Sequence, residues 1–203
     1  MWWPSLLTIT RIFLSPIFFL LYVEYEALGI SFQWLPYLLI GLLAVSELSD
    51  AFDGYVARRL NQVTDLGKIL DPMADSISRI SVFLTFTQGV IQLPLLLVFV
   101  FIYRDAVVST LRTVCALRGV ALAARQSGKI KAVAQAIAAF FILGLLALYA
   151  GHKISIDLLQ SYSFWSVAIV AIYTLLSMGD YIWANRQHIK KLLQTRAPRL
   201  HKK

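Results

Sequence analysis

The sequence has few charged residues and no polar stretch long enough to fold as a soluble domain. Charged residues make up 15% of its 203 residues, whereas hydrophobic residues make up 59%. The longest polar stretches are residues 58–68, residues 112–131 and the tail from Arg186. A chain this apolar needs lipid around it, so the composition indicates a membrane protein rather than a soluble domain.

Cysteine and histidine are also scarce. Cys115 is the single cysteine, which excludes an internal disulfide, and we expect it to be a packing residue. The histidines His152, His188 and His201 are spread through loops and the tail, at no spacing typical of a metal site or a catalytic triad. A basic segment and a cleavage site typical of a secretory signal are missing, and Arg11 interrupts the first apolar stretch, so we expect this segment to remain in the mature protein.

Acidic residues are outnumbered by basic ones, 11 against 19, which gives a formal net charge of +8. A soluble protein of this charge would be a candidate for nucleic-acid binding. Here, however, the basic residues lie in short segments between and after the apolar stretches, a pattern that suits an anionic membrane surface. We therefore expect membrane lipids, and no nucleic acid, among the partners.

Six apolar stretches are candidates for crossing a bilayer, for which a helix needs about 20 residues. The expected spans are residues 5–25, 33–56, 69–90, 92–113, 129–150 and 159–184. The sequence thus predicts an all-α, polytopic membrane protein with one domain over residues 1–203, including a basic tail over residues 186–203. The first ten residues either form a short N-terminal interfacial helix or simply lengthen the first span.

Lysine and arginine are distributed unevenly between the two ends of these spans. They are frequent in residues 58–68, in residues 112–131 and in the tail, whereas the opposite connections contain only Lys153. Because short cytoplasmic segments are enriched in these residues, both termini and the basic connections are expected on the cytoplasmic side.

Four aspartates lie where the second and third spans meet the connection between them. Asp50 and Asp53 are three residues apart near the end of the second span, and Asp71 and Asp75 are four apart near the start of the third. Each spacing places a pair on one helical face, and the connection reverses the chain. We expect the two helices to bring four carboxylates together at one depth.

Such a group of carboxylates needs positive charge beside it, because even one ionised aspartate at the centre of a membrane helix costs about 2.5–3.5 kcal/mol. Carboxylates without histidine or cysteine favour hard cations, chiefly Mg²⁺ or Mn²⁺ and also Ca²⁺. Two such ions about 3.5–4 Å apart can hold a phosphoryl group and its flanking oxygens. Gly54 and Ala57 permit close approach of a nucleotide, and Arg58 offers a cation for phosphate oxygen.

Together these residues read D-x2-D-G-x2-A-R-x8-G-x3-D-x3-D, with Gly67 at the second glycine position. This run resembles the signature of the CDP-alcohol phosphatidyltransferases, and every fixed position occurs at the family's spacing. The resemblance implies a fold of six transmembrane helices, a bacterial inner membrane location with the active site on the cytoplasmic side, and in many relatives a homodimer.

The resemblance also implies a reaction and residue roles. An alcohol hydroxyl attacks the β-phosphate of a CDP-linked lipid, usually CDP-diacylglycerol, and CMP leaves. Asp50, Asp53, Asp71 and Asp75 would hold two Mg²⁺ or Mn²⁺ ions, with Asp75 also acting as general base. The CDP pocket would be lined by Asp50, Gly54, Ala57 and Arg58.

A second stretch is similar to the bacterial phosphatidylglycerophosphate synthases, whose acceptor is glycerol 3-phosphate. It contains Arg104-Asp105, then Ser109, Leu111 and Arg112, and finally Gly128-Lys129-Ile130-Lys131. The resemblance implies that the acceptor phosphate binds Arg104, Arg112, Lys129 and Lys131, beside a fifth span that starts at Ser127-Gly128. The alternative for the two lysines is a simple positive-inside role.

Other charged residues have simpler interpretations. We expect Arg79 to pair with an acidic neighbour, Glu47 to be a buried or supporting acid, and Asp105 to orient or neutralise Arg104. Asp180, near the end of the last span, has no partner apparent in the sequence.

Two other functions stay open at this point. One is a CDP-alcohol phosphotransferase with inositol phosphate, serine or phosphatidylglycerol as acceptor. The other is a cation-binding or transport protein, which explains acids within a membrane but not the spacing of Gly54, Ala57 and Arg58.

Overall fold

Six helices make up the part of the chain that the computed structural model describes, namely residues 3–59, 65–117, 125–187 and 189–190. The side chains of residues 3–10 and 50–72 lie outside this description. The helices are α1 (Trp3–Val23), α2 (Leu35–Arg59), α3 (Asp65–Thr85), α4 (Leu95–Leu117), α5 (Gln126–Ala150) and α6 (Ile156–Ala184). Each expected span therefore has its helix, and the all-α prediction is confirmed.

The third helix differs most from its expected bounds, residues 69–90. It ends at Thr85, and the residues after it form the connection to α4. Gly89 there has a φ of 62°, a left-handed conformation that glycine adopts without steric cost. The Tyr22 hydroxyl of α1 donates to the carbonyl oxygen of Gln88 at 3.1 Å, which fixes this turn against α1.

The separate N-terminal interfacial helix was a wrong expectation, since α1 runs unbroken from Trp3 to Val23. Pro4 lies in the first turn of α1, where the missing N–H would have no partner within the helix. Nothing in the local sequence therefore separates a short helix from the first long one, and the alternative of a lengthened first helix holds.

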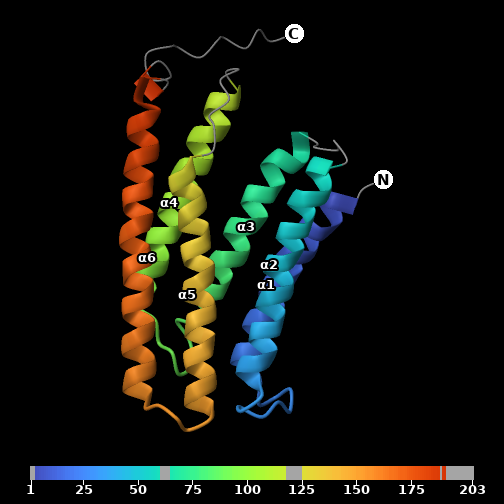
Figure 1. Ribbon diagram of the computed structural model, residues 1–203, viewed down its shortest axis with the longest axis vertical. Coiled ribbons are helices and arrows are strands. Elements are labelled where there is room, and N and C mark those ends of the chain that lie inside the picture. Colours follow the sequence, from blue (N-terminus) through green and yellow to red (C-terminus); the bar gives the residue numbers. More distant parts are fainter. Residues whose placement is uncertain (1–2, 60–64, 118–124, 188, 191–203) are drawn as a thin grey trace, which may run out of the picture.

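The helices form two groups of three, as Figure 1 shows. In the first group α1 packs against both α2 and α3, and in the second α6 packs against both α4 and α5. The groups meet where α5 contacts α2 and α3 and where α3 contacts α4. The end of α2, the starts of α3 and α5 and the end of α6 all lie at one end of the molecule (Figure 1).

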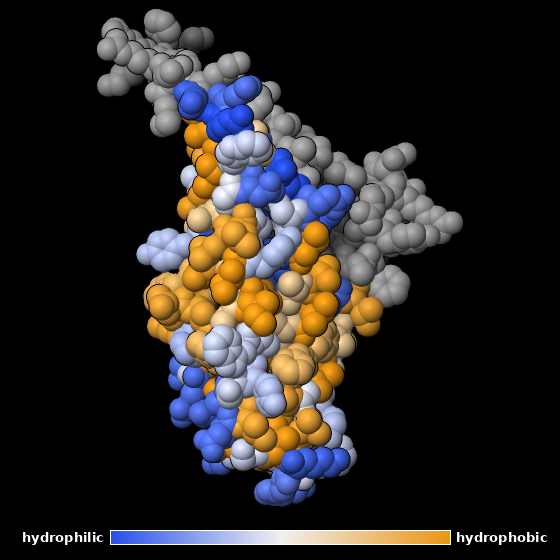
Figure 2. Space-filling model, turned by 60° about the vertical axis from the view of Figure 1, so that its left-hand side comes forward, coloured by the Kyte–Doolittle hydropathy of each residue, from blue (hydrophilic) through white to orange (hydrophobic). Residues whose placement is uncertain are grey.

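Aliphatic and aromatic side chains fill the interior and also cover much of the outside. The centre of the core includes Phe83, Phe86 and Phe101, all almost inaccessible to solvent. Large apolar side chains on the outer faces of the helices are exposed, among them Ile169, Ile172 and Leu176. Figure 2 shows such residues across the middle of the molecule, with hydrophilic residues gathered toward the two ends.

Among the described residues, α5 and α6 are long and apolar enough to cross a membrane, and the apolar parts of α1 and α2, Arg11–Val23 and Leu35–Ser49, are shorter. The exposed apolar band and these two helices are what a chain embedded in lipid requires.

Candidate active site

A cavity of about 880 Å³ lies between the two groups of helices. Its lining comes from α2, α3, α4, α5 and α6. One part is apolar, with Ile77, Ile80, Ile102, Ile137 and Phe140. The other part is charged, and basic side chains outnumber acidic ones there: Arg79, Arg104, Arg112, Arg125, Lys129 and Lys131 against Glu47, Asp75 and Asp105.

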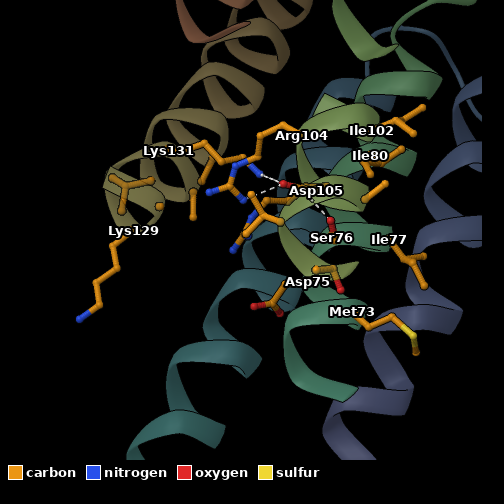
Figure 3. Close-up of a pocket in the computed structure, with 18 of the residues that line it drawn as sticks. Met73, Asp75, Ser76, Ile77, Ile80, Ile102, Arg104, Asp105, Lys129 and Lys131 are labelled. Carbon is orange, nitrogen blue, oxygen red and sulfur yellow. Dashed lines mark hydrogen bonds and ion pairs between the residues drawn. The ribbon is translucent and has the colours of Figure 1, made fainter. Parts of the chain in front are cut away.

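Asp105 is the centre of a buried ion cluster that joins three helices. Figure 3 shows Ser76 of α3, Arg104 of α4 and Lys131 of α5 converging on its carboxylate. Lys131 Nζ donates to its two oxygens at 2.7 and 2.9 Å, Arg104 Nη1 donates at 2.9 Å, and the Ser76 hydroxyl also donates. The expected role of Asp105 in orienting Arg104 is confirmed.

Lys131 belongs to this cluster and not to the solvated surface. Its side chain is only 4% exposed and is bonded to Asp105, so it is not a solvated residue of a basic loop. Lys129, two residues earlier, is exposed and points away from Asp105 (Figure 3). The two lysines that the sequence pattern treats alike therefore have different surroundings.

Arg104 also lies close to the backbone at the start of α5. A Cβ atom built on Gly128 would be 3.2 Å from Arg104 Nη2, which is tighter than an ordinary contact. Glycine at this position thus allows the guanidinium to lie against the first turn of α5. That helix begins at Gln126 and has no acidic residue in its first turn. The positive charge of the basic side chains near its start therefore adds to the positive end of the helix dipole.

Asp75 forms an ion pair with Arg11. In the sequence Arg11 is recognisable only as a charge that interrupts the first apolar stretch. The Arg11 side chain is 4% exposed and reaches Asp75 from α1. Sequence reasoning gave Arg11 no role, although an arginine inside an apolar stretch is itself a signal, because such a cation needs a buried partner.

Two further ion pairs border the cavity. Arg79 lies 3.8 Å from Glu47, which confirms the expected acidic neighbour. Arg125 donates through Nε and Nη2 to the two oxygens of Asp180 at 2.8 and 2.9 Å, and the Ser127 hydroxyl donates to the same carboxylate at 2.6 Å. Asp180 thus ties the start of α5 to the end of α6, a contact that no local sequence pattern indicates.

The remaining expected site residues are placed only by their helices. Asp50, Asp53, Gly54, Ala57 and Arg58 fall in α2, and Gly67 and Asp71 fall in α3, but their side chains lie outside the described residues. Contacts between α2 and α3 are likewise not among those of the described residues.

The helix bounds nevertheless fix how far along each helix the aspartates lie. Asp53 lies six residues before the end of α2 at Arg59, and Asp71 lies six residues after the start of α3 at Asp65. At a rise of ~1.5 Å per residue, each is about 9 Å along its helix from the connection. Asp50 and Asp75 each follow about one turn further from the connection.

The expected metal ligands are four aspartates of α2 and α3. No three histidine, cysteine or acidic side chains gather as a metal site among those described, and Asp75 is the only one of the four expected ligands in that set. The chemistry of the four-aspartate set, all hard oxygen donors, fits Mg²⁺ or Mn²⁺.

The fold and the cavity define a class: a helical protein with a lipid-compatible outer surface and a basic, partly apolar cavity beside an acidic side chain. Such a cavity suits a molecule with an anionic part and an apolar part. Comparison with known proteins narrows the class, because residues 1–176 match the CDP-alcohol phosphatidyltransferase family. The chain belongs to this family of membrane-associated enzymes of phospholipid synthesis.

Three similar proteins come from the bacteria Bacillus subtilis, Rickettsia typhi and Salmonella choleraesuis. The chain is 32% identical over 195 residues to the CDP-diacylglycerol–glycerol-3-phosphate 3-phosphatidyltransferase of Bacillus subtilis (strain 168), covering 92% of this chain and 96% of that protein. It is 32% identical over 177 residues to the protein of the same name from Rickettsia typhi, covering 84% and 91%. The Salmonella choleraesuis protein of that name is 31% identical over 192 residues, covering 90% and 94%.

Proposed function

We propose that this enzyme transfers the phosphatidyl group of CDP-diacylglycerol to glycerol 3-phosphate, forming phosphatidylglycerophosphate and CMP. The observation that carries the proposal is the basic part of the cavity, to which α4 and α5 contribute Arg104, Arg112, Lys129 and Lys131 and which also includes Asp75 in its lining. An acceptor without a phosphate, such as serine, would not need so many cations, whereas inositol phosphate would. The names of the similar bacterial proteins, CDP-diacylglycerol–glycerol-3-phosphate 3-phosphatidyltransferases, support glycerol 3-phosphate as the acceptor.

Asp75 is the proposed general base. It would take the proton from the acceptor hydroxyl as that oxygen forms a bond to the β-phosphorus of the donor. The bond from this phosphorus to the oxygen that bridges it to CMP breaks at the same centre, and CMP leaves with the bonding electrons. Arg11, bonded to Asp75, would hold the carboxylate in position.

Asp50, Asp53, Asp71 and Asp75 are the proposed ligands of two Mg²⁺ or Mn²⁺ ions. Bound there, the ions would neutralise charge on the diphosphate and on the departing CMP. Asp50, Gly54, Ala57 and Arg58 are proposed to line the CDP pocket. Arg104 and Arg112 are the proposed main contacts of the acceptor phosphate, with Lys131 acting through the Asp105 cluster and Lys129 at the exposed rim.

The same proposal places the protein in a bacterial inner membrane. All six helices would cross or enter the bilayer, with both termini and the cavity on the cytoplasmic side. The exposed apolar side chains of the outer faces and the basic residues at the cavity end support this orientation.

The acceptor is tested by giving purified protein CDP-diacylglycerol, Mg²⁺ or Mn²⁺, and one alcohol at a time, with CMP release as the readout. We expect release with glycerol 3-phosphate and none with serine, inositol phosphate or phosphatidylglycerol. In Arg112→Ala the KM for glycerol 3-phosphate should rise about tenfold or more, since a hydrogen-bonded charge pair is lost. Release with another acceptor in preference would contradict the proposal.

A further inference from the structure

Tyr181 is a buried residue of α6 that lines the same cavity. It is 2% exposed, and its hydroxyl has no hydrogen-bond partner among the residues that the structure describes. A buried tyrosine hydroxyl normally has a partner, because leaving it unpaired costs free energy. The absence of one inside a cavity indicates that the partner is a bound molecule.

The other buried hydroxyls of α6 show why Tyr181 is unusual. Thr174 and Ser177 donate to carbonyl oxygens of their own helix, at 2.7 and 2.9 Å. Ser163 also has a hydroxyl without a described partner, but it does not line the cavity. A tyrosine ring carries its hydroxyl too far from the helix axis to use the same internal acceptors.

Neighbouring contacts hold Tyr181 in place. The preceding residue, Asp180, is bonded to Arg125 and Ser127 at the start of α5. The Tyr181 carbonyl oxygen accepts from the Asn185 side chain at 2.8 Å and from its backbone N–H at 3.2 Å. A donor fixed in this way loses little conformational freedom when a ligand binds.

Two arginines of α4 that line the cavity have donors in the same condition. The Nε atoms of Arg104 and Arg112 are buried without hydrogen-bond partners among the described residues. A phosphate offers three strongly accepting oxygens, which would match donors arriving from several directions. Within the described contacts α6 packs on α4, which carries both arginines, and on α5, and not on α2, where the proposed CDP residues lie.

We infer that Tyr181 is a specificity-determining residue whose hydroxyl donates to the phosphate of the acceptor substrate. This inference rests on the proposed function, because it requires a phosphorylated acceptor on the α4 side of the cavity. The hydroxyl favours a phosphorylated alcohol over a neutral one, and it leaves the CDP-linked donor unaffected.

The test uses the full-length protein in detergent with the isosteric change Tyr181→Phe. The KM for glycerol 3-phosphate should rise about tenfold, while kcat and the KM for CDP-diacylglycerol stay within about twofold. Without ligand, the melting temperature should be unchanged or higher, since an unpaired buried hydroxyl has been removed. The increase in melting temperature that glycerol 3-phosphate gives should be smaller than in the wild type.

Tyr162→Phe is the matched control, because Tyr162 lies on the same helix with its side chain 52% exposed. It should change none of these values. An unchanged KM for glycerol 3-phosphate in Tyr181→Phe, a raised KM for CDP-diacylglycerol, or a lower melting temperature without ligand would each overturn the inference. If the wild type releases no CMP with glycerol 3-phosphate, the proposed function fails, and the melting-temperature comparison still reports on the hydroxyl.

Discussion

Arg11 of α1 and Asp75 of α3 form an ion pair, and this pair sets the surroundings of the proposed general base. Arg11 is buried in α1 and bonded to the carboxylate that is proposed to take the acceptor's proton. Removing one partner of a buried ion pair leaves the other charge uncompensated. Arg11 is therefore expected to affect the chemical step more than the binding of glycerol 3-phosphate.

Replacing Arg11 tests this at the level of one residue. In Arg11→Gln, kcat should fall about tenfold or more, since the carboxylate loses the contact that orients it for proton transfer. The KM for glycerol 3-phosphate should change little, and Arg11→Lys should restore part of kcat. A well-folded Arg11→Gln protein with undiminished kcat would show that this contact is not needed for the reaction.

At the residue scale, the sequence indicates the charged side chains and acidic neighbours for Arg79 and Arg104, but not the partners of Arg11 and Lys131. Arg104, Arg112, Lys129 and Lys131 all line the cavity, as expected for residues that act together. The bonds from Lys131 to Asp105 and from Arg11 to Asp75 join residues 26 and 64 positions apart. Such pairs depend on how helices pack, which the spacing of residues along one helix does not encode.

The start of α5 is the element on which most of the basic site depends. Its first turn carries Ser127, which bonds to Asp180, and Gly128, against which Arg104 lies. One turn further, Lys131 bonds to Asp105 of α4. The first two turns of α5 thus connect this helix to α4 and α6.

Gly128→Ala tests this arrangement. The added methyl group would displace Arg104 Nη2 from its place 3.2 Å away, so the KM for glycerol 3-phosphate should rise several-fold. Gly144→Ala on the same helix is the control, because an added Cβ there meets nothing within 4 Å. That change should leave KM alone and stabilise the protein by up to about 1 kcal/mol. An equal KM in the two variants would mean that glycerol 3-phosphate binding does not depend on the place of the Arg104 guanidinium beside Gly128.

At the element scale, hydropathy and length predicted the number and order of the helices well. The end of α3 differs from the expected one because apolar residues such as Phe86, Val90 and Ile91 continue past Thr85, where the helix ends, through the turn that contains Gly89. For the first ten residues the sequence allows either a short interfacial helix or a longer first span, and α1, unbroken from Trp3, corresponds to the second.

At the scale of the whole molecule, the two groups of three helices enclose one cavity with an apolar part and a charged part, which suits both proposed substrates. The proposed donor is a lipid, and the apolar part of the lining, which includes Ile77 and Phe140, is suited to hydrocarbon. The charged part lies at the end where the expected cytoplasmic connections are. The sequence predicted this end from lysine and arginine counts, but the division into two groups follows from packing alone.

The central claim is that Asp75 takes a proton from a phosphorylated alcohol at a metal-dependent site. The most direct measurement is CMP release from CDP-diacylglycerol by the wild type and by Asp75→Asn, with Asp157→Asn as an exposed control at the opposite end of the molecule. We expect release that needs both glycerol 3-phosphate and Mg²⁺ or Mn²⁺ in the wild type and the control, and a loss of about 10²-fold or more in Asp75→Asn. Full activity in a folded Asp75→Asn protein, or wild-type release unaffected by chelation of divalent metal, would contradict the account.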